Sequence, residues 1–354
     1  MSEIQSIDKA PRPKPEPKRK VELIVMNAAH IQEKEYTEPV FVVEKVLHKG
    51  ATLAMARPKF GKSWLALQLA IAVSTGRKAL GRFEVPKKGR VLYMALEDTE
   101  SRIHRRLAAL NIGDEKFTGI DFAFNLPEKL GDSGDIRISH YLQQHKGEYS
   151  VVILDTMLAA FGSDTRQDRV QADYDKSAIL RKLADDNNVA LLAIHHQNKG
   201  KDPAQLMDTV NGTTGLAAGV DSTLFLTEEK GQKVLHVVSR ETESADFAIK
   251  FDLGQGGWSV EGPAQEVLLC AGQRVIVALL NDAGPMKSKE IVDALGKKGN
   301  TTRTQLHRLK NTGVLRLLPN GAYWLANKSV PEGYDTKPRF CGPITEADPA
   351  DVPF

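Results

Sequence analysis

The sequence has 354 residues, 41% of them hydrophobic, and a formal net charge of +3 at pH 7. This length and hydrophobic content suit a globular protein with one large and one smaller domain. Two widely separated cysteines, Cys270 and Cys341, argue against a disulfide framework or a zinc site. The polar beginning of the chain, and the lack of an apolar stretch of about 20 residues, predict a cytoplasmic protein without membrane contact.

Basic charge is concentrated towards the two ends. Residues 1–20 carry six Lys or Arg against three Asp or Glu, and residues 264–328 carry ten against four. Residues 329–354 carry two Lys or Arg against five Asp or Glu, and the central residues 21–263 are mildly acidic. The distribution suits an enzyme core with accessory surfaces for a polyanion, although a solvated Lys-rich face is the commoner origin of such charge.

The first segment, residues 1–35, is predicted to be a disordered, basic, proline-rich arm. Proline occupies every second position from Pro11 to Pro17, which forbids a helix and leaves an extended, solvated chain.

A strand–loop–helix pattern follows. Residues 51–56 form a short apolar run typical of a buried strand, and residues 64–73 have the dense apolar pattern of a core helix. Gly61-Lys62-Ser63 lies between them, as in a P-loop, where backbone N–H groups and a helix N-terminus bind phosphate. Ala56 stands where the P-loop motif usually has its first glycine, which alanine tolerates if its φ is negative. The predicted ATP-binding residues are Ala56, Arg57, Pro58, Lys59, Phe60, Gly61, Lys62, Ser63 and Trp64.

Apolar strands then alternate with helical patterns. This alternation predicts an α/β fold with a mostly parallel sheet that is covered on both faces and binds ligands beyond the carboxyl ends of its strands. The later strands have short connections and are expected to be antiparallel. Strands are expected at residues 90–95, 120–124, 150–155, 188–194, 223–226, 234–239 and 248–251, and helices at 101–110, 136–145 and 174–187.

Beyond residue 263 the pattern changes. Helices are expected at 265–280, at 288–295 with Ser288 as N-cap, and at 302–311. A hairpin at 313–325 turns at Asn320-Gly321. This order predicts a winged helix-turn-helix. The expected domains are therefore an ATPase domain at 36–262, a winged-helix domain at 263–328 and a disordered acidic tail at 329–354.

Two P-loop residues and two acids at strand ends are expected to act on ATP and Mg²⁺. Lys62 would reach the β- and γ-phosphates and Ser63 would ligate Mg²⁺. Asp155, after four apolar residues, fits an acid that holds the Mg²⁺ shell through water, and Glu97 can activate the attacking water. Acids that cap strands are common, and Glu97 could simply be a first-turn acid of the next helix. The P-loop upstream favours the catalytic interpretation of both.

Two further features complete the order of a RecA-like ATP-driven motor. His195 and His196 end a strand and are candidates for sensing the γ-phosphate. Arg240 ends a late strand and is a candidate arginine finger that acts on a neighbouring subunit. Taken alone, Arg240 would most often be a partner in a surface ion pair.

These segments resemble a family. Val-Leu-Tyr-Met-Ala-Leu-Glu97-Asp98, Val-Val-Ile-Leu-Asp155-Thr-Met, Ala-Ile-His195-His196-Gln-Asn-Lys199 and the block from Asn211 to Asp221 are similar to plasmid-type RepA hexameric helicases. These helicases are RecA-fold ATPases related to DnaB-type replicative helicases. The resemblance covers residues 43–252. It implies an ATP- and Mg²⁺-dependent ring helicase that assembles as a hexamer, with Glu97 as catalytic base and Arg240 as finger. Arg102 and Arg106 remain alternatives for the finger.

In the resembling helicases, two loops face a central channel and grip single-stranded DNA. By resemblance these are residues 158–173, with Arg166 and Arg169, and residues 197–212, with Lys199 and Lys201. Loops that track phosphates need a few cations, which both segments have. Ordinary solvated loops are the rival interpretation.

The expected third helix of the winged-helix domain carries Arg303, Arg308 and Lys310, which suit contact with duplex DNA. Winged helices also serve as protein-docking modules, but this region is the most basic of the chain.

The function predicted from the sequence is an ATP-hydrolysing, ring-forming DNA helicase of plasmid, phage or mobile-element replication. One alternative is a RecA-like recombination or repair ATPase that forms filaments. The other is a replication-initiation or regulatory DNA-binding protein that uses ATP as an assembly switch.

Overall fold

The computed structural model describes residues 25–34, 39–110, 116–162, 169–196, 215–229, 231–269, 271–296, 299–332 and 334. The chain divides into two compact units, residues 1–38 and 39–354. In the first unit, α1 (Ala28–Glu33) begins after Asn27, whose side chain accepts a hydrogen bond from the Ala29 amide. The expected disorder of residues 1–35 therefore does not extend to this helix, because the alternating prolines end at Pro17 and an Asn cap precedes an Ala-Ala start.

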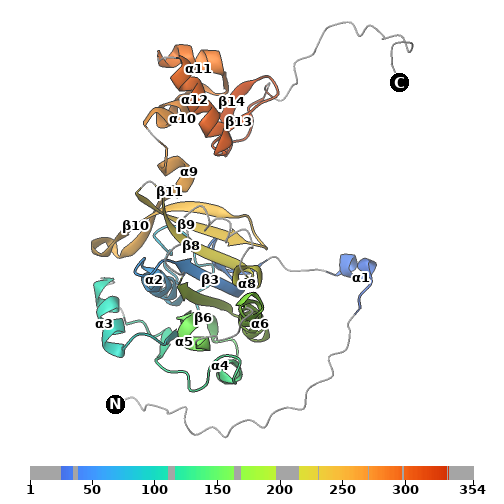
Figure 1. Ribbon diagram of the computed structural model, residues 1–354, viewed down its shortest axis with the longest axis vertical. Helices are drawn as coiled ribbons and strands as arrows, with labels where there is room; N and C mark the ends of the chain where they lie inside the picture. The colour runs from blue at the N-terminus through green and yellow to red at the C-terminus, as the bar shows by residue number, and fades with distance from the viewer. Residues whose placement is uncertain are drawn as a thin grey trace. The chain divides into compact units, whose positions relative to one another are not determined.

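A nine-stranded sheet forms the centre of the second unit (Figure 1). The six strands from β8 to β5 are parallel, and β9, β10 and β11 continue the sheet in antiparallel pairing. This is the mostly parallel α/β sheet that the sequence predicts, with antiparallel later strands. In sheet order the strands are β11 (Gly257–Pro263), β10 (Ala245–Asp252), β9 (Gln232–Ser239), β8 (Ser222–Glu229), β3 (Gly50–Ala56), β7 (Ala190–His196), β6 (Tyr149–Asp155), β4 (Arg90–Ala95) and β5 (Ile120–Ala123).

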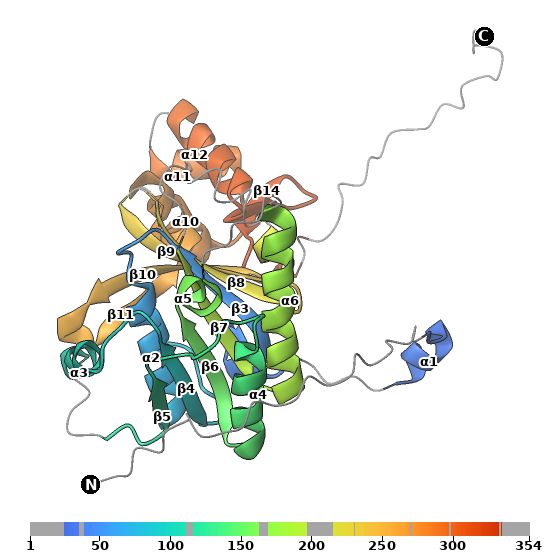
Figure 2. The same ribbon diagram turned by 60° about the horizontal axis from the view of Figure 1, so that its bottom comes forward.

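Helices cover both faces of this sheet (Figure 2). One face carries α2 (Lys62–Thr75) and α3 (Glu100–Ala109), and the other carries α4 (Gly134–Gln144), α5 (Met157–Phe161) and α6 (Arg169–Asn187). Alternate side chains of a strand point to opposite faces, so Ile153 belongs to the core under α2 while Leu154 belongs to the core under α6. Burial on both faces explains the unbroken apolar runs of the parallel strands.

The parallel strands end together at one edge of the sheet. Ala56 at the end of β3 pairs with His196 of β7, and Ala95 at the end of β4 pairs with Asp155 of β6. We call this edge the carboxyl edge, and the opposite one, where β3 begins at Gly50, the amino edge. Residues that follow parallel strands are thereby gathered in one place.

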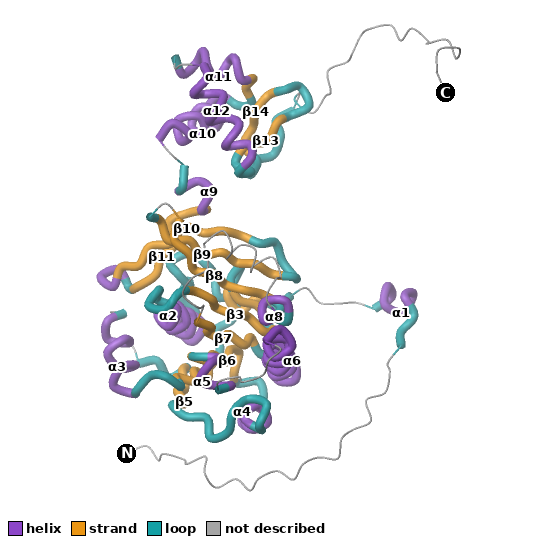
Figure 3. The backbone as a smooth tube through the Cα atoms, viewed as in Figure 1, coloured by secondary structure: helices purple, strands orange, loops and turns teal. Residues whose placement is uncertain are grey.

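Several short elements accompany the nine-stranded sheet, and two of them, α8 and α9, are labelled in Figure 3. Among the described residues, no helix combines the length and apolar character needed to cross a membrane. The additional elements are β1 (Phe41–Val43), which pairs with β2 (Leu47–His48), α8 (Gly215–Ala218), the 3₁₀ helix η3 (Leu253–Gln255) and α9 (Ala264–Val267).

Where it is described, the C-terminal part has three helices, a three-stranded antiparallel sheet in the order β12-β14-β13, and its own apolar core. The predicted hairpin is present, with Asn320 and Gly321 between β13 and β14. The elements are α10 (Ala271–Ala283), β12 (Met286–Lys287), α11 (Ser288–Leu295), α12 (Gly299–Asn311), β13 (Leu315–Leu317) and β14 (Ala322–Leu325).

Two local predictions for this part are wrong. The single helix expected at 265–280 is interrupted after Val267, because α9 packs against β10 and β11 whereas α10 joins the C-terminal core. The N-cap of α11 is Lys287 rather than Ser288, since the carboxylate of Glu290 accepts the Lys287 backbone N–H at 2.6 Å. The apolar pattern alone does not reveal either change.

Candidate active site

The loop between β3 and α2, residues 57–61, lies at the carboxyl edge. Gly61 has a φ of +93° and immediately precedes α2. A Cβ atom on Gly61 would lie 2.7 Å from the Trp258 ring, and the Trp258 indole N–H donates to the Gly61 carbonyl at 3.1 Å. Both the backbone conformation and the packing therefore require glycine. Ala56 is buried at the end of β3 and its φ is not positive, so an alanine fits there without backbone strain.

Lys62 begins α2 and is buried, with 3% of its surface exposed. Its ammonium donates to the carbonyl oxygens of Ala56 at 2.8 Å and Arg57 at 2.9 Å. Burial lowers the pKa of Lys62 to about 8, and the negative charges of Asp155 and Glu97 oppose that shift. The start of α2 thus carries a buried cation with a lowered pKa, which suits an anionic ligand.

Asp155 ends β6 and is 4% exposed. Its carboxylate accepts a hydrogen bond from the Tyr93 hydroxyl at 2.8 Å and another from Ser63. Burial raises the pKa of Asp155, and these two hydrogen bonds oppose the change. Burial and the nearby Asp155 also raise the pKa of Tyr93, so the phenol keeps its proton as a donor.

Glu97 lies two residues beyond the end of β4. Its Oε1 accepts a hydrogen bond from the Thr156 hydroxyl at 2.5 Å, and its Oε2 lies 3.8 Å from Nε2 of His196. Burial, with the charges of His196 and Lys62, lowers the pKa of His195 to about 4, so this imidazole is neutral at physiological pH. The ends of β3, β4, β6 and β7 therefore bring together all the phosphate-site residues predicted at strand ends except Arg240.

Arg240 lies at the amino edge. It follows Ser239 of β9, which pairs with Ser222 of β8, and Ser222 in turn pairs with Thr52 near the start of β3. Its backbone N–H donates to the Asp221 carbonyl at 3.0 Å, and its exposed guanidinium reaches the Ala218 carbonyl. Because Lys62 lies beyond the opposite end of β3, Arg240 cannot contact the site of its own chain.

The two alternatives for the finger are engaged within the chain. Arg102 pairs with Asp98 at 2.8 Å, and Arg106 pairs with the other oxygen of the same carboxylate. The Arg106 guanidinium also lies 5.7 Å from the centre of the Trp64 ring. Asp98 is largely buried, so these contacts hold both arginines near the N-terminus of α3.

The residues predicted to bind DNA are only partly described. Arg166, Lys199 and Lys201 lie outside the described residues. The first expected loop, 158–173, is shorter than predicted, because α5 extends to Phe161 and α6 begins at Arg169. The three cations predicted on the third helix of the C-terminal part are exposed on α12; they are Arg303, Arg308 and Lys310.

Three residues in or beside the site were missed by the sequence reasoning. Tyr93 is hidden in an apolar strand pattern, and Trp258 lies far along the chain from Gly61, so neither has a local signal. Thr156 directly follows Asp155, and its position next to a strand-ending acid was a usable signal.

The donor set fits a nucleotide with a divalent cation. Ser63 supplies a hydroxyl oxygen and Asp155 a carboxylate, which are hard oxygen ligands of the kind that Mg²⁺ prefers, and they are hydrogen-bonded to each other. The Lys62 ammonium and the N-terminus of α2 lie beside them and suit phosphate.

A comparison with known families agrees with this site. A family model described as AAA domain matches residues 17–202. A solved structure, titled as an ATPase domain, is similar at 15% sequence identity and a TM-score of 0.43, over 60% of this chain and 84% of that one. No curated protein matches the sequence.

Proposed function

The chain belongs to the AAA domain family, whose model matches more than half of its residues, and from that premise we propose that it is an ATP-hydrolysing, ring-forming DNA helicase. The family is one of P-loop ATPases, which implies a bound nucleotide with a divalent metal ion. Replication of a plasmid, phage or mobile element is the setting that the resemblance to RepA helicases suggests. The observation that carries the proposal is the convergence of Lys62, Asp155 and Glu97 at the carboxyl edge.

Each group of the site has a distinct role in this proposal. Lys62 would bind the β- and γ-phosphates, and Ser63 and Asp155 would hold Mg²⁺, Asp155 through water. The metal ion supplies positive charge to the phosphates when it is bound. Glu97 orients the attacking water and accepts its proton, and one of His195 and His196 contacts the γ-phosphate. Catalysis then consists mainly of positioning and charge stabilisation.

The remaining part of the proposed site comes from a second copy. Arg240 is exposed at the amino edge and lies away from its own Lys62, and in the proposed ring its guanidinium would leave the Ala218 carbonyl and reach the carboxyl edge of a neighbour. A closed ring, by resemblance a hexamer, repeats this pairing at every interface.

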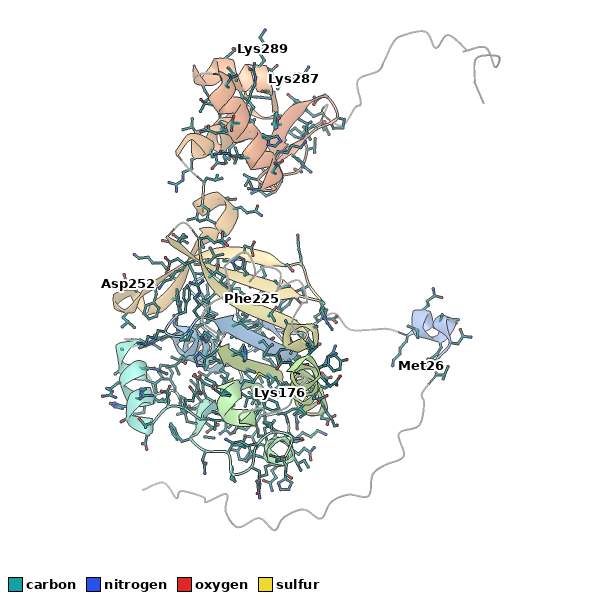
Figure 4. All side chains as sticks on the ribbon, in the orientation of Figure 1. Met26, Lys176, Phe225, Asp252, Lys287 and Lys289 are labelled. Carbon is teal, nitrogen blue, oxygen red and sulfur yellow. The ribbon has the colours of Figure 1, made fainter. Side chains whose placement is uncertain are left out.

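DNA contact is assigned to two places. The segments 158–173, whose two ends belong to α5 and α6, and 197–212 are proposed to face the channel and contact single-stranded DNA. The C-terminal part, within the proposed domain 263–328, is interpreted as a winged helix because α10, α11 and α12 precede the β13–β14 hairpin. Its exposed cations include Arg303, Arg308 and Lys310 on α12. Lys287 and Lys289, at the start of α11, are also exposed and are labelled in Figure 4. They suit the phosphates of duplex DNA.

ATPase assays with and without single-stranded DNA test the proposal, with Lys62→Ala as the inactive control. The wild-type protein should hydrolyse ATP faster with DNA and displace an annealed strand, and Lys62→Ala should do neither. DNA-stimulated hydrolysis by Lys62→Ala would refute the site. Slow hydrolysis without strand displacement would instead favour an assembly switch, and open filaments in electron micrographs would favour a recombination ATPase.

The winged-helix assignment has its own test in the full chain. Replacing Arg303, Arg308 and Lys310 with alanine should weaken duplex binding and make its salt dependence shallower. Unchanged duplex binding by this variant would point to protein docking.

A further inference from the structure

Thr156 links the carboxylate of Glu97 to the start of α5. The residue follows Asp155 directly, and 1% of its surface is exposed. Its hydroxyl donates to Oε1 of Glu97 at 2.5 Å and accepts a hydrogen bond from the Ala159 backbone N–H at 3.4 Å. The same side chain therefore touches a proposed catalytic group and caps a helix.

The two contacts fix the hydroxyl in one orientation. A threonine hydroxyl has one proton to donate and two lone pairs to accept with. Because an ionised carboxylate can only accept, the hydroxyl proton is directed at Glu97, and a lone pair remains to accept the Ala159 N–H. Threonine is also restricted at χ1 by its branched Cβ, so the donor has little freedom to turn away.

Glu97, in contrast, has few restraints of its own. Its side chain is 44% exposed, and the Nε2 atom of His196 is 3.8 Å from Oε2, beyond hydrogen-bonding distance. Among the described residues, Thr156 supplies the hydrogen bond that the structure gives to this carboxylate. That bond engages Oε1 and leaves Oε2 able to accept a proton from water.

We propose that Thr156 is a positioning residue for Glu97 in ATP hydrolysis. This inference rests on the proposed function of the same site. Thr156 selects the rotamer in which Oε2 faces the reacting water, and it takes no part in binding the phosphates or the metal ion. Its removal should therefore lower kcat and leave nucleotide affinity unchanged.

Thr156→Val tests this, since valine keeps the branched shape and lacks the hydroxyl. Losing a hydrogen bond to a charged group in the transition state should lower kcat about 10- to 100-fold. KM and the ATP dissociation constant, measured by calorimetry, should stay within about twofold. Thr156→Ser restores the hydroxyl and should retain most of the wild-type kcat.

Two further variants separate positioning from a general loss of structure. Thr52 is a buried threonine of β3 whose hydroxyl bonds to Ser222 at 2.7 Å, near the amino edge. Thr52→Val makes the same chemical change away from Glu97 and should leave kcat near the wild-type value. In a Glu97→Ala background, Thr156→Val should cause no further loss, because there is no carboxylate left to position.

The outcomes are distinct. A wild-type kcat in Thr156→Val, an equal loss in Thr156→Ser, or a full additional loss in the Glu97→Ala background would each overturn the inference while leaving the proposed ATPase intact. A wild-type protein that binds ATP and does not hydrolyse it would overturn the proposed function, and the inference with it.

Discussion

Two groups of residues at opposite edges of the nine-stranded sheet, the proposed phosphate site and the Asp221 network, differ in how far their polar groups are satisfied. At the carboxyl edge, Lys62 has a lowered pKa, and Nδ1 of His196 is buried without a hydrogen-bond partner among the described residues. At the amino edge, Asp221 accepts the Ala51 N–H at 2.8 Å and pairs with Arg181 at 3.0 Å. Its backbone carbonyl also accepts the Arg240 N–H.

We interpret Lys62 and His196 as part of a ligand-binding site and the Asp221 network as a structural element. Groups with shifted pKa values and buried polar atoms without hydrogen-bond partners are typical of ligand-binding sites. The Asp221 network, in which each oxygen has a partner, is typical of a rigid anchor. In the proposed ring, the amino edge of one chain would present Arg240 from this anchor to the carboxyl edge of the next.

The largest effect is expected from a variant that removes the proposed contact between the amino edge of one chain and the carboxyl edge of the next. Arg240→Ala should lower ATP turnover by about 10³- to 10⁵-fold, the range for an arginine finger, with ATP affinity nearly unchanged. Mixing it with Lys62→Ala should restore part of the activity, because some interfaces then join an intact Lys62 to an intact Arg240. Steady-state ATPase assays of the mixtures measure this. If mixing restores nothing, Arg240 does not act across an interface.

A smaller effect is expected from weakening the anchor. Asp221→Ala leaves the Ala51 N–H without its side-chain acceptor and removes the partner of Arg181. The free energy of unfolding should fall by about 1–3 kcal/mol in urea denaturation, the cost of an unsatisfied buried polar group. Asp221→Asn retains one carbonyl oxygen and should lose less. Equal stability of Asp221→Ala and wild type would contradict the anchor.

Nucleotide binding at the carboxyl edge should depend on pH through Lys62. Bound phosphate favours the charged form of Lys62, so the complex keeps its proton at a pH where the free protein, with a pKa of about 8, loses it. ATP affinity should therefore be constant below about pH 8 and fall up to tenfold, or about 1.4 kcal/mol, per pH unit above it. Calorimetric titrations from about pH 7 to 9.5 measure the change. Lys62→Arg stays charged and should remove this dependence; a flat wild-type profile would be contrary evidence.

The smallest expected effect concerns the hydrogen bond between Trp258 and Gly61 at the carboxyl edge. Trp258→Phe removes the indole N–H bond to the Gly61 carbonyl and should cost about 1 kcal/mol of stability and raise the KM for ATP a few-fold. Trp324→Phe loses a similar bond, to the Ser329 carbonyl at 2.9 Å in the C-terminal part, and should leave the KM unchanged. Equal KM values for both variants would show that the Gly61 contact has no influence on the site.

Local patterns predicted the elements that carry the site. The apolar runs before Ala56, Ala95, Asp155 and His195 identified four parallel strands, because strands buried on both faces must be continuously apolar. Parallel pairing then brings their carboxyl ends together, so the sequence order of Lys62, Glu97 and Asp155 was enough to expect one site.

Local sequence patterns could not predict contacts between residues that are far apart in the chain. Trp258 belongs to β11, a strand the sequence analysis did not expect, and its bond to Gly61 joins residues far apart in the chain. The break after Val267 has the same origin, since the apolar spacing continues although α9 contacts β10 and β11 and α10 belongs to the C-terminal core. Thr156 was visible beside Asp155, but only the fold brings its hydroxyl to Glu97.

The bond between Trp258 and Gly61 also provides an optical probe. The chain has three tryptophans, and the emission of an indole responds to changes in its surroundings. Trp258 is 2% exposed and bonded to the β3–α2 loop, and Trp64 lies in the first turn of α2, so two of the three indoles adjoin the proposed phosphate site. In a Trp324→Phe protein, intrinsic fluorescence would therefore follow the arrival of a nucleotide without any attached label.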